Sequence, residues 1–373
     1  MVNWWLDKGL GGFRIDAIIN IKKPAVFHDY PADRADGLCA IQCMLKEAEG
    51  IGTFLGELRD RTFRIHDSFS VGEVFDAKEE EIPDFVGDNG YFSSMFDFRT
   101  ALIGADFAGW YRRKPVQAGA YIKAVYESQK KMGDVGFYSN IIENHDEPRG
   151  VSHYLPEGEC CTEGKKMLAM ISFMVRGIPF IYEGQEIGME NKKFTSIEEV
   201  DDCSTLFEYQ TALEVGLTPE QAIEAVGRYS RDNARTPMQW DDSENAGFTT
   251  GTPWLAVNPN YKQINVKAQQ EDQDSVLAFY KKLTALRKSA EYKETIVYGA
   301  FIPVPQEDEN VMVFYRKSAE KTLLAAANYQ SVETDIKIPG QVKKEVLNNV
   351  NKLQMKDGVL HMSGYQAVVL EVV

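Results

Sequence analysis

The stretch GGFRIDAIINIKK, residues 11–23, places an arginine and an aspartate two positions apart inside an apolar run. Side chains at positions i and i+2 of a β-strand point to the same face, so Arg14 and Asp16 should share one face of a strand. The other face then carries the apolar side chains of Phe13, Ile15 and Ala17. Two interpretations stay open: the pair neutralises itself at the rim of a sheet, or it serves a functional site.

The residues before this strand predict the class of fold. In VNWWLDKGL, residues 2–10, apolar residues recur at helical spacing, with Lys8 near the end and Gly9 closing the helix. A helix, a glycine turn and a β-branched strand are typical of α/β proteins with parallel strands. Such strands are usually buried on both faces, where a charge pair is costly unless it serves a function, and this stretch alone does not decide between the two interpretations.

Strand-like and helical segments alternate along the chain, which predicts an α/β domain over residues 1–294. A helix is expected within residues 39–63. The further strands are expected within residues 69–75, 93–98, 137–149 and 178–188. Residues 190–262 are rich in turn formers and aromatic residues and predict a long loop excursion. Residues 295–373 contain short alternating segments, which predict a closing antiparallel β domain.

The composition excludes several classes of protein. The 373 residues carry a net charge of −15, which argues against nucleic acid as a partner. No apolar run is long enough to span a bilayer, so no membrane partner is expected. The first residues predict a helix rather than a secretion signal, and we therefore expect a cytoplasmic protein. Nothing in the sequence predicts the oligomeric state.

The cysteines receive no chemical role from their spacing. They are Cys39, Cys43, Cys160, Cys161 and Cys203. Their number is odd and their spacings match no zinc pattern, so we expect free thiols in a reducing compartment. Cys39 and Cys43 are four positions apart on a predicted helix, which could bring their thiols close together.

Charged residues gather at the predicted carboxyl ends of the strands, where α/β barrels carry their active sites. Asp16 ends the first strand and Glu73 the second, while His145 and Asp146 end the fourth, with Arg149 just beyond. Neither a Gly-x-Ser-x-Gly elbow nor a phosphate-binding glycine loop occurs. Two or more carboxylates at one site are typical of glycosidic bond cleavage, in which one acts as nucleophile and another as acid and base. Taken alone, a histidine such as His145 is more often part of a core.

Five longer stretches carry a family pattern. They are GFRIDAI (12–18), VGEVF (71–75), ENHDEPR (143–149), GIPFIYEGQEIGM (177–189) and SRDNARTPMQWDDSENAGFTTGTPW (230–254). Together they resemble the α-glucosidase and oligo-1,6-glucosidase branch of glycoside hydrolase family 13, the α-amylase family. The resemblance implies a partial (β/α)8 TIM barrel, made of strands four to eight, and then a C-terminal antiparallel β-sandwich. It also implies that the first three strands and a small inserted domain belong before Met1.

The resemblance implies a division of labour between the first two strands. Asp16 would be the nucleophile, and Arg14 would hold it ionised and aimed. Glu73 would act first as general acid and then as general base, so its surroundings should raise its pKa.

The resemblance assigns substrate binding to residues further along the chain. Asp146 would be the third catalytic carboxylate and would bind sugar hydroxyls. His145 would donate a hydrogen bond to the same sugar, and Arg235 would bind the glucose at the non-reducing end. No cofactor is implied, and no metal ligand is assigned, because the calcium site of some relatives lies in the part expected before Met1.

The function implied by the resemblance is that of a retaining α-glucosidase. It would release glucose from the non-reducing end of short maltose- or isomaltose-type glucosides by double displacement. A valine after the nucleophile tends to accompany α-1,6 specificity in this branch, so Ala17 favours α-1,4 or mixed specificity. The alternatives are an inactive truncated fragment, a trehalose- or sucrose-acting relative, and a transglycosylating relative. A non-catalytic transporter-associated subunit is disfavoured, because such proteins have lost the catalytic carboxylates.

Overall fold

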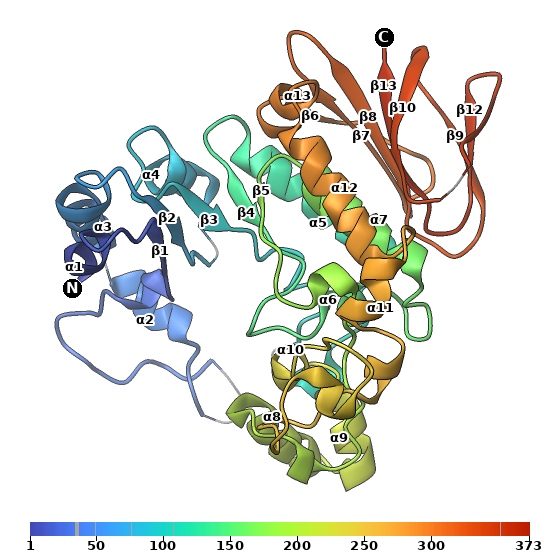
Figure 1. Ribbon diagram of the computed structural model, residues 1–373. Coiled ribbons are helices and arrows are strands. Elements are labelled where there is room, and N and C mark those ends of the chain that lie inside the picture. The colour runs from blue at the N-terminus through green and yellow to red at the C-terminus, as the bar shows by residue number, and fades with distance from the viewer. Residues whose placement is uncertain (34–36, 49, 76, 107, 351) are drawn as a thin grey trace. The chain divides into compact units, whose positions relative to one another are not determined.

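The computed structural model describes residues 1–33, 37–48, 50–75, 77–106, 108–350 and 352–373. The chain forms two compact units, and each is described by itself (Figure 1). The first unit comprises Met1–Phe98 and Lys130–Ser139. The second unit comprises Arg99–Gln129 and Asn140–Val373.

A parallel sheet organises the first unit. Its strands, in the order in which they pair, are β1 (Gly12–Ile15), β2 (Phe69–Gly72), β3 (Ser94–Phe96) and β4 (Tyr138–Asn140). Gly12 pairs with Phe69, and a side chain at Gly12 would lie 1.9 Å from the Phe69 carbonyl oxygen, so this position admits only glycine. The predicted parallel α/β organisation is confirmed.

Short helices accompany this sheet, and they are α1 (Val2–Leu6), α2 (Ile41–Glu47), α3 (Ile51–Leu58) and α4 (Ile82–Val86), with 3₁₀ turns at Ile18–Asn20 and Glu79–Glu81. The prediction of one continuous helix within residues 39–63 was wrong. It is interrupted before α3, where Gly50 has φ 88°, and a π-helical turn over Arg59–Phe63 follows α3. The first strand, expected over residues 12–19, ends at Ile15, and Ala17 with φ 41° has left the extended region.

The second unit is mostly helical before its C-terminal strands. Its α-helices are α5 (Ala118–Met132, the last three residues of which belong to the first unit), α6 (Gly150–Tyr154), α7 (Thr162–Met174), α8 (Cys203–Glu214), α9 (Pro219–Gly227), α10 (Asp232–Arg235), α11 (Val266–Glu271), α12 (Val276–Lys288) and α13 (Lys293–Val297). Its 3₁₀ turns are Trp110–Arg112, Gln185–Ile187, Ile197–Glu199, Glu244–Gly247 and Pro259–Lys262. The short strand β5 (Ile178–Pro179) lies beside the end of β4, where the Phe180 N–H donates to the Asn140 carbonyl at 2.9 Å.

The predicted loop excursion over residues 190–262 was wrong, because this segment contains helices α8, α9 and α10. Helix α8 is capped by Asp202, whose carboxylate accepts hydrogen bonds from the N–H groups of Ser204 and Thr205. Helix α9 begins with Thr218 as a capping residue and with proline at its first position. These capping residues begin the helices locally, although the stretch that follows them is rich in turn formers.

Antiparallel sheets close the chain, as predicted. One sheet has the strand order β10 (Val342–Asn348), β13 (Ala367–Val372), β8 (Thr322–Asn328), β7 (Val311–Lys317) and β6 (Ala300–Pro303). The other has the order β11 (Gln354–Lys356), β12 (Val359–Met362) and β9 (Thr334–Lys337). Buried side chains from both sheets form one hydrophobic cluster, so the two sheets pack face to face.

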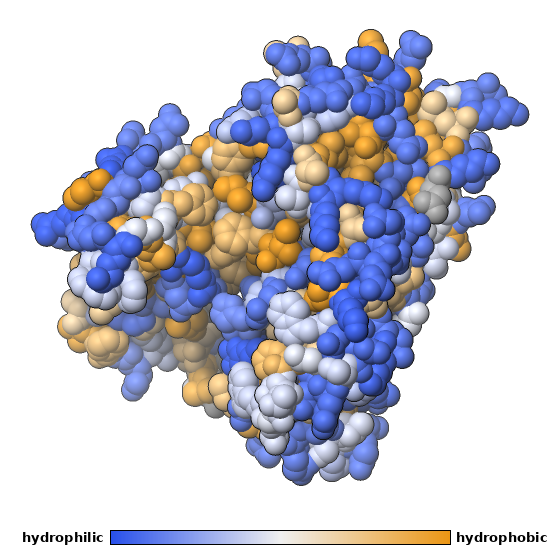
Figure 2. Space-filling model, viewed as in Figure 1, coloured by the Kyte–Doolittle hydropathy of each residue, from blue (hydrophilic) through white to orange (hydrophobic). Residues whose placement is uncertain are grey.

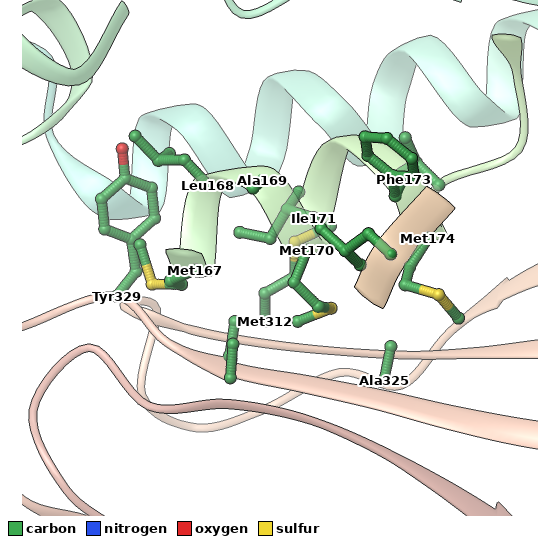
Figure 3. Packing of buried hydrophobic residues seen from close by; sticks show 14 of the residues in the cluster. Met167, Leu168, Ala169, Met170, Ile171, Phe173, Met174, Met312, Ala325 and Tyr329 are labelled. Atoms are coloured by element: carbon green, nitrogen blue, oxygen red, sulfur yellow. The ribbon is translucent and has the colours of Figure 1, made fainter. Parts of the chain in front are cut away.

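The larger sheet is the middle layer of the second unit. Val311 and Val313 of β7 join the cluster between the two sheets, whereas Met312 joins a second cluster on the opposite face. Figure 3 shows this second cluster, in which Met170 and Met174 of α7 lie beside Met312 and the neighbouring strand. The strands of the larger sheet share this hydrophobic core with α7, so the core does not separate the chain at residue 294. The predicted domain boundary between residues 294 and 295 stays a prediction.

Helix α12 illustrates how the second unit meets solvent. Val276, Phe279 and Leu283 are buried on its inner side, while Lys281 and Lys282 are exposed. Figure 2 shows the hydrophilic outer side of this helix. Among the residues that the structure describes, no helix has the length and apolar character needed to cross a bilayer.

Candidate active site

Two neighbouring strand ends bring three predicted site residues together in the first unit. Ile15 and Gly72 are the last paired residues of β1 and β2, so Asp16 and Glu73 follow directly at adjacent strand ends. The Glu73 N–H donates to the Ile15 carbonyl at 3.0 Å and extends the pairing by one step. We call Arg14, Asp16 and Glu73 the Arg14 set.

A single guanidinium joins both carboxylates of the Arg14 set. Arg14 Nη1 lies 2.7 Å from Asp16 Oδ1, and Arg14 Nη2 lies 2.8 Å from Glu73 Oε1. The exposed fraction of the side chain is 70% for Asp16 and 8% for Glu73. One carboxylate is therefore open to approach from solvent in this unit, while the other is enclosed.

The backbone turn after β1 reaches the other oxygen of Glu73. Ala17 adopts a left-handed conformation, and its N–H donates to Glu73 Oε2 at 2.8 Å. Burial raises the pKa of the Glu73 carboxyl, whereas the Ala17 N–H and Arg14 lower it; a hydrogen bond shared with Asp16 raises it again. The net result is a raised pKa, which suits a group that must hold a proton before it donates it.

The second unit brings the remaining predicted residues together around one carboxylate. Asp146 Oδ1 lies 3.2 Å from Arg235 Nη2 and 3.4 Å from Arg231 Nη1, and Asp146 Oδ2 lies 3.0 Å from His145 Nε2. Arg235 Nε also donates to the His145 carbonyl at 3.0 Å. We call these four residues the Asp146 set.

Arg231 was not predicted as a site residue. Its Nε donates to Asp202 Oδ1 at 2.7 Å, so it connects Asp146 to the residue that caps helix α8. Asp202 has a fully buried side chain; burial raises its pKa, but hydrogen bonds from Arg231 and Thr205 hold the pKa below its ordinary value. The sequence offered one indication, since Arg231, just before α10, and Arg235, at its end, are four positions apart in SRDNAR, a spacing at which helical side chains are neighbours.

A buried ion pair joins the two ends of the loop that carries His145 and Asp146. Arg149 Nη1 lies 2.9 Å from Glu143 Oε1, and the exposed fractions of the two side chains are 1% and 0%. The Gly150 N–H donates to the other oxygen of Glu143 at 2.6 Å. Arg149 Nη1 also donates to the Glu183 carbonyl at 2.7 Å, which fixes the loop to the segment after β5.

Glu147, next to Asp146, is a further titratable group of this loop. Burial raises the pKa of its carboxyl to about 7; Arg113 acts in the opposite direction, and Asp146 adds to the increase. The motif does not predict a role for Glu147, because the burial of this side chain cannot be inferred from its position in the sequence.

The family is established by comparison with known proteins. Residues 1–299 match the model of the α-amylase catalytic domain. The chain is 36% identical over 330 residues to a probable oligo-1,6-glucosidase 3 of Bacillus subtilis, covering 88% of this chain and 58% of that protein. It is also 36% identical over 344 residues to an oligo-1,6-glucosidase of Parageobacillus thermoglucosidasius, covering 92% of this chain and 61% of that protein. The chain thus spans about three fifths of the length of these curated relatives.

Solved structures give the same result for the fold. The trehalose-6-phosphate hydrolase of Bacillus licheniformis matches with a TM-score of 0.88 and 31% identity, covering 99% of this chain and 66% of that one. The trehalulose synthase of Pseudomonas mesoacidophila MX-45 matches with a TM-score of 0.89 and 28% identity, covering 100% of this chain and 67% of that one. The chain belongs to the α-amylase family, glycoside hydrolase family 13.

Proposed function

We propose that the chain carries the catalytic residues of a retaining α-glucosidase that acts on short α-linked glucosides. The observation that supports this most directly is the Arg14 set, in which one guanidinium joins an exposed carboxylate to an enclosed one. A nucleophile must be within reach of the substrate, whereas a general acid needs surroundings that keep its proton bound. The exposed Asp16 and the enclosed Glu73 differ in this way. The similarity to oligo-1,6-glucosidases supports the same class of substrate.

The reaction has two displacements. First, an Asp16 carboxylate oxygen attacks the anomeric carbon, the glycosidic C–O bond breaks, and the Glu73 carboxyl gives its proton to the departing oxygen. In the second displacement Glu73 takes a proton from water, the water oxygen attacks the anomeric carbon, and the ester bond to Asp16 breaks. Each step inverts the anomeric centre, so the released glucose has the α configuration.

The Asp146 set is assigned to substrate binding. Asp146 accepts hydrogen bonds from sugar hydroxyls and favours the oxocarbenium-like transition state, while His145 donates a hydrogen bond to the sugar. Arg235 binds the glucose at the non-reducing end. Their mutual contacts support these roles, because a carboxylate held by three cationic or imidazole donors is fixed in orientation before substrate arrives.

Ala17 bears on the choice of linkage. We expect α-1,4 or mixed specificity, with a valine at this position shifting the preference towards α-1,6 bonds. The expected outcome for Ala17→Val is a rise of a few-fold in the ratio of isomaltose to maltose hydrolysis, measured as kcat/KM for each sugar. The same assay with trehalose, trehalose 6-phosphate and sucrose tests the trehalose-acting, sucrose-acting and transglycosylating alternatives. The similarity to the trehalose-6-phosphate hydrolase and trehalulose synthase structures is the reason to include these sugars.

The proposal extends to the architecture. Strands β1 to β5 would correspond to strands four to eight of an eight-stranded barrel, with a catalytic domain over residues 1–294 and an all-β domain over residues 295–373. A cytoplasmic location and a small α-glucoside as the partner belong to the same proposal. The alternative is a chain that folds but lacks activity because other parts of the catalytic domain are needed.

The deciding experiment is hydrolysis of an aryl α-glucoside by the purified chain. We expect measurable turnover, release of α-glucose seen by NMR, and a loss of about 10⁴-fold or more in Asp16→Asn, because the covalent ester cannot form. Asp29→Asn, which changes another exposed aspartate, is the matched control and should leave turnover unchanged. A folded chain with no turnover on any of these substrates would favour the inactive alternative, and equal rates in Asp16→Asn would refute the nucleophile assignment.

A further inference from the structure

The first unit also brings two thiols and a carboxylate together, away from the Arg14 set in sequence. Among the residues that the structure describes, Asp33, Cys39 and Cys43 form the one group of potential metal ligands whose donor atoms all lie within 4.8 Å of one another. Asp33 Oδ2 lies 4.0 Å from Cys39 Sγ and 3.6 Å from Cys43 Sγ. Within the described part of the chain no disulfide joins the cysteines.

The backbone around helix α2 holds the carboxylate in this position. The Asp33 N–H donates to the Leu38 carbonyl at 3.1 Å, which holds Asp33 beside the residues that precede the helix. The Ala40 N–H, at the cap of α2, donates to Asp33 Oδ1 at 3.0 Å. One carboxylate oxygen is therefore fixed by the backbone, and the other is turned towards both thiols.

The spacing of the donor atoms fits a tetrahedral zinc ion. Zinc bonds of about 2.3 Å to sulfur and about 2.0 Å to oxygen place a sulfur and an oxygen ligand about 3.5 Å apart. The observed separations of 3.6 and 4.0 Å need only small side-chain rotations to reach that value. Thiolates are soft ligands and favour zinc over magnesium or calcium, which prefer oxygen.

We propose that Asp33, Cys39 and Cys43 bind one Zn²⁺ ion at the start of helix α2, with the fourth position open to water. Binding releases the thiol protons, so that two thiolates and one carboxylate face the cation. Glu47, one turn after Cys43, is engaged elsewhere, because His28 Nε2 and Tyr30 Oη each lie 3.0 Å from its Oε2. The sequence spacing did not predict this site, since the hydrogen bonds that hold Asp33 beside the thiols are a property of the fold.

Metal titration of the reduced full-length chain tests the proposal. We expect one equivalent of Zn²⁺ to bind in competition with a chromophoric chelator, and Co²⁺ to give the near-ultraviolet charge-transfer absorption of a cobalt thiolate. Cys39→Ser/Cys43→Ser should weaken Zn²⁺ binding by about 100-fold or more, and Asp33→Asn by about 10-fold. Cys203→Ser and Asp29→Asn are the matched controls and should bind as the unaltered chain does.

Alkylation of the unaltered chain tests the proposal without requiring any variant to fold. Zn²⁺ should protect the thiols of Cys39 and Cys43 from iodoacetamide, as seen by peptide mass spectrometry, and should leave Cys203 reactive. Absence of stoichiometric binding under reducing conditions, equal binding by the double variant, or protection of other cysteines would each overturn the proposal. A Cys39–Cys43 disulfide that forms in air, with no metal binding after its reduction, would also overturn it.

Discussion

The two candidate site sets use opposite ratios of cations to carboxylates. In the Arg14 set one guanidinium serves two carboxylates, those of Asp16 and Glu73. In the Asp146 set two guanidiniums and an imidazole serve a single carboxylate. With one cation for two carboxylates, the Arg14 set can keep a proton on one carboxyl group. The Asp146 set instead surrounds a single carboxylate with fixed hydrogen-bond donors. The difference suggests that proton transfer belongs to the first set and substrate binding to the second.

The two sets also differ in how they are supported. The Arg14 set depends on two strand ends and on the turn at Ala17. The Asp146 set is anchored by Arg231 to the buried Asp202, and its loop is enclosed by the buried pair Glu143–Arg149. Changes to the first set should therefore affect rate more than stability, and changes to the anchors of the second should affect stability more than rate.

After Asp16→Asn, the largest effect on rate is expected from Glu73→Gln, which keeps the shape of the side chain but cannot donate the proton. Turnover of natural disaccharides should fall by about 10³-fold, and that of an aryl glucoside with an activated leaving group by much less. Comparing kcat for the two substrates measures this difference. Glu80→Gln, an exposed control, should leave both rates unchanged. Equal losses on both substrates would contradict the acid role and weaken the contrast between the two sets.

Arg14→Met should lower kcat by about 10²-fold and change the pH profile in a definite direction. Arg14 lowers the pKa of Glu73, so its removal raises that pKa, and the alkaline limb of kcat/KM should move to higher pH. The matched control is Arg61→Met, which breaks an exposed pair with Glu57. An unmoved alkaline limb would mean that Arg14 does not act on Glu73.

Arg231→Met tests the support of the Asp146 set. It removes the nearer of the two cations of the buried Asp202 carboxylate, leaving Arg235 Nη1 at 4.0 Å, and should lower the free energy of unfolding by about 2 kcal/mol in urea titration. This is less than for a fully buried pair, because the Arg231 side chain is 25% exposed. Arg228→Met, which breaks a 3.8 Å surface pair with Glu157, is the control. A stability loss in Arg14→Met as large as that in Arg231→Met would remove the proposed distinction.

Glu147→Gln should remove a pH dependence of stability. Because burial raises the pKa of Glu147 from 4.5 to about 7, the folded chain binds more protons than the unfolded chain between these values. This contribution to the free energy of unfolding is complete below pH 4.5 and is lost as pH rises to about 7. We expect a loss of roughly 3 kcal/mol over this window in the unaltered chain relative to the variant, since one pKa unit corresponds to about 1.4 kcal/mol.

The measurement for Glu147 is urea unfolding at pH 4.5 and at pH 7.5 on both proteins. Glu157→Gln, at an 89% exposed side chain, should retain the pH dependence of the unaltered chain. Identical slopes in the unaltered chain and in Glu147→Gln would show that the carboxyl is not buried as described.

The sequence predicted what depends on local spacing. Arg14 and Asp16, two positions apart, indeed form a close ion pair, and the parallel strands and the closing antiparallel sheets follow from periodicity. It did not predict contacts that only the fold creates. Arg231 lies beside Asp146 across 85 positions, and the thiols of Cys39 and Cys43 lie within 4.0 Å of Asp33. The left-handed turn at Ala17 was also missed, since alanine gives no indication of positive φ.

The discontinuity of the first unit has a consequence for how the protein is made. Its sheet takes β1 to β3 from residues 12–96 but β4 from residues 138–140, after the chain has passed through Arg99–Gln129 of the second unit. At a synthesis rate of about 5–20 residues per second, β4 follows β3 by roughly 2–8 s. During that interval the edge of β3 has no partner and exposes unpaired backbone groups. The nascent chain is therefore most open to mispairing in the window just before residue 140 is added, and a pause in translation there would lengthen it.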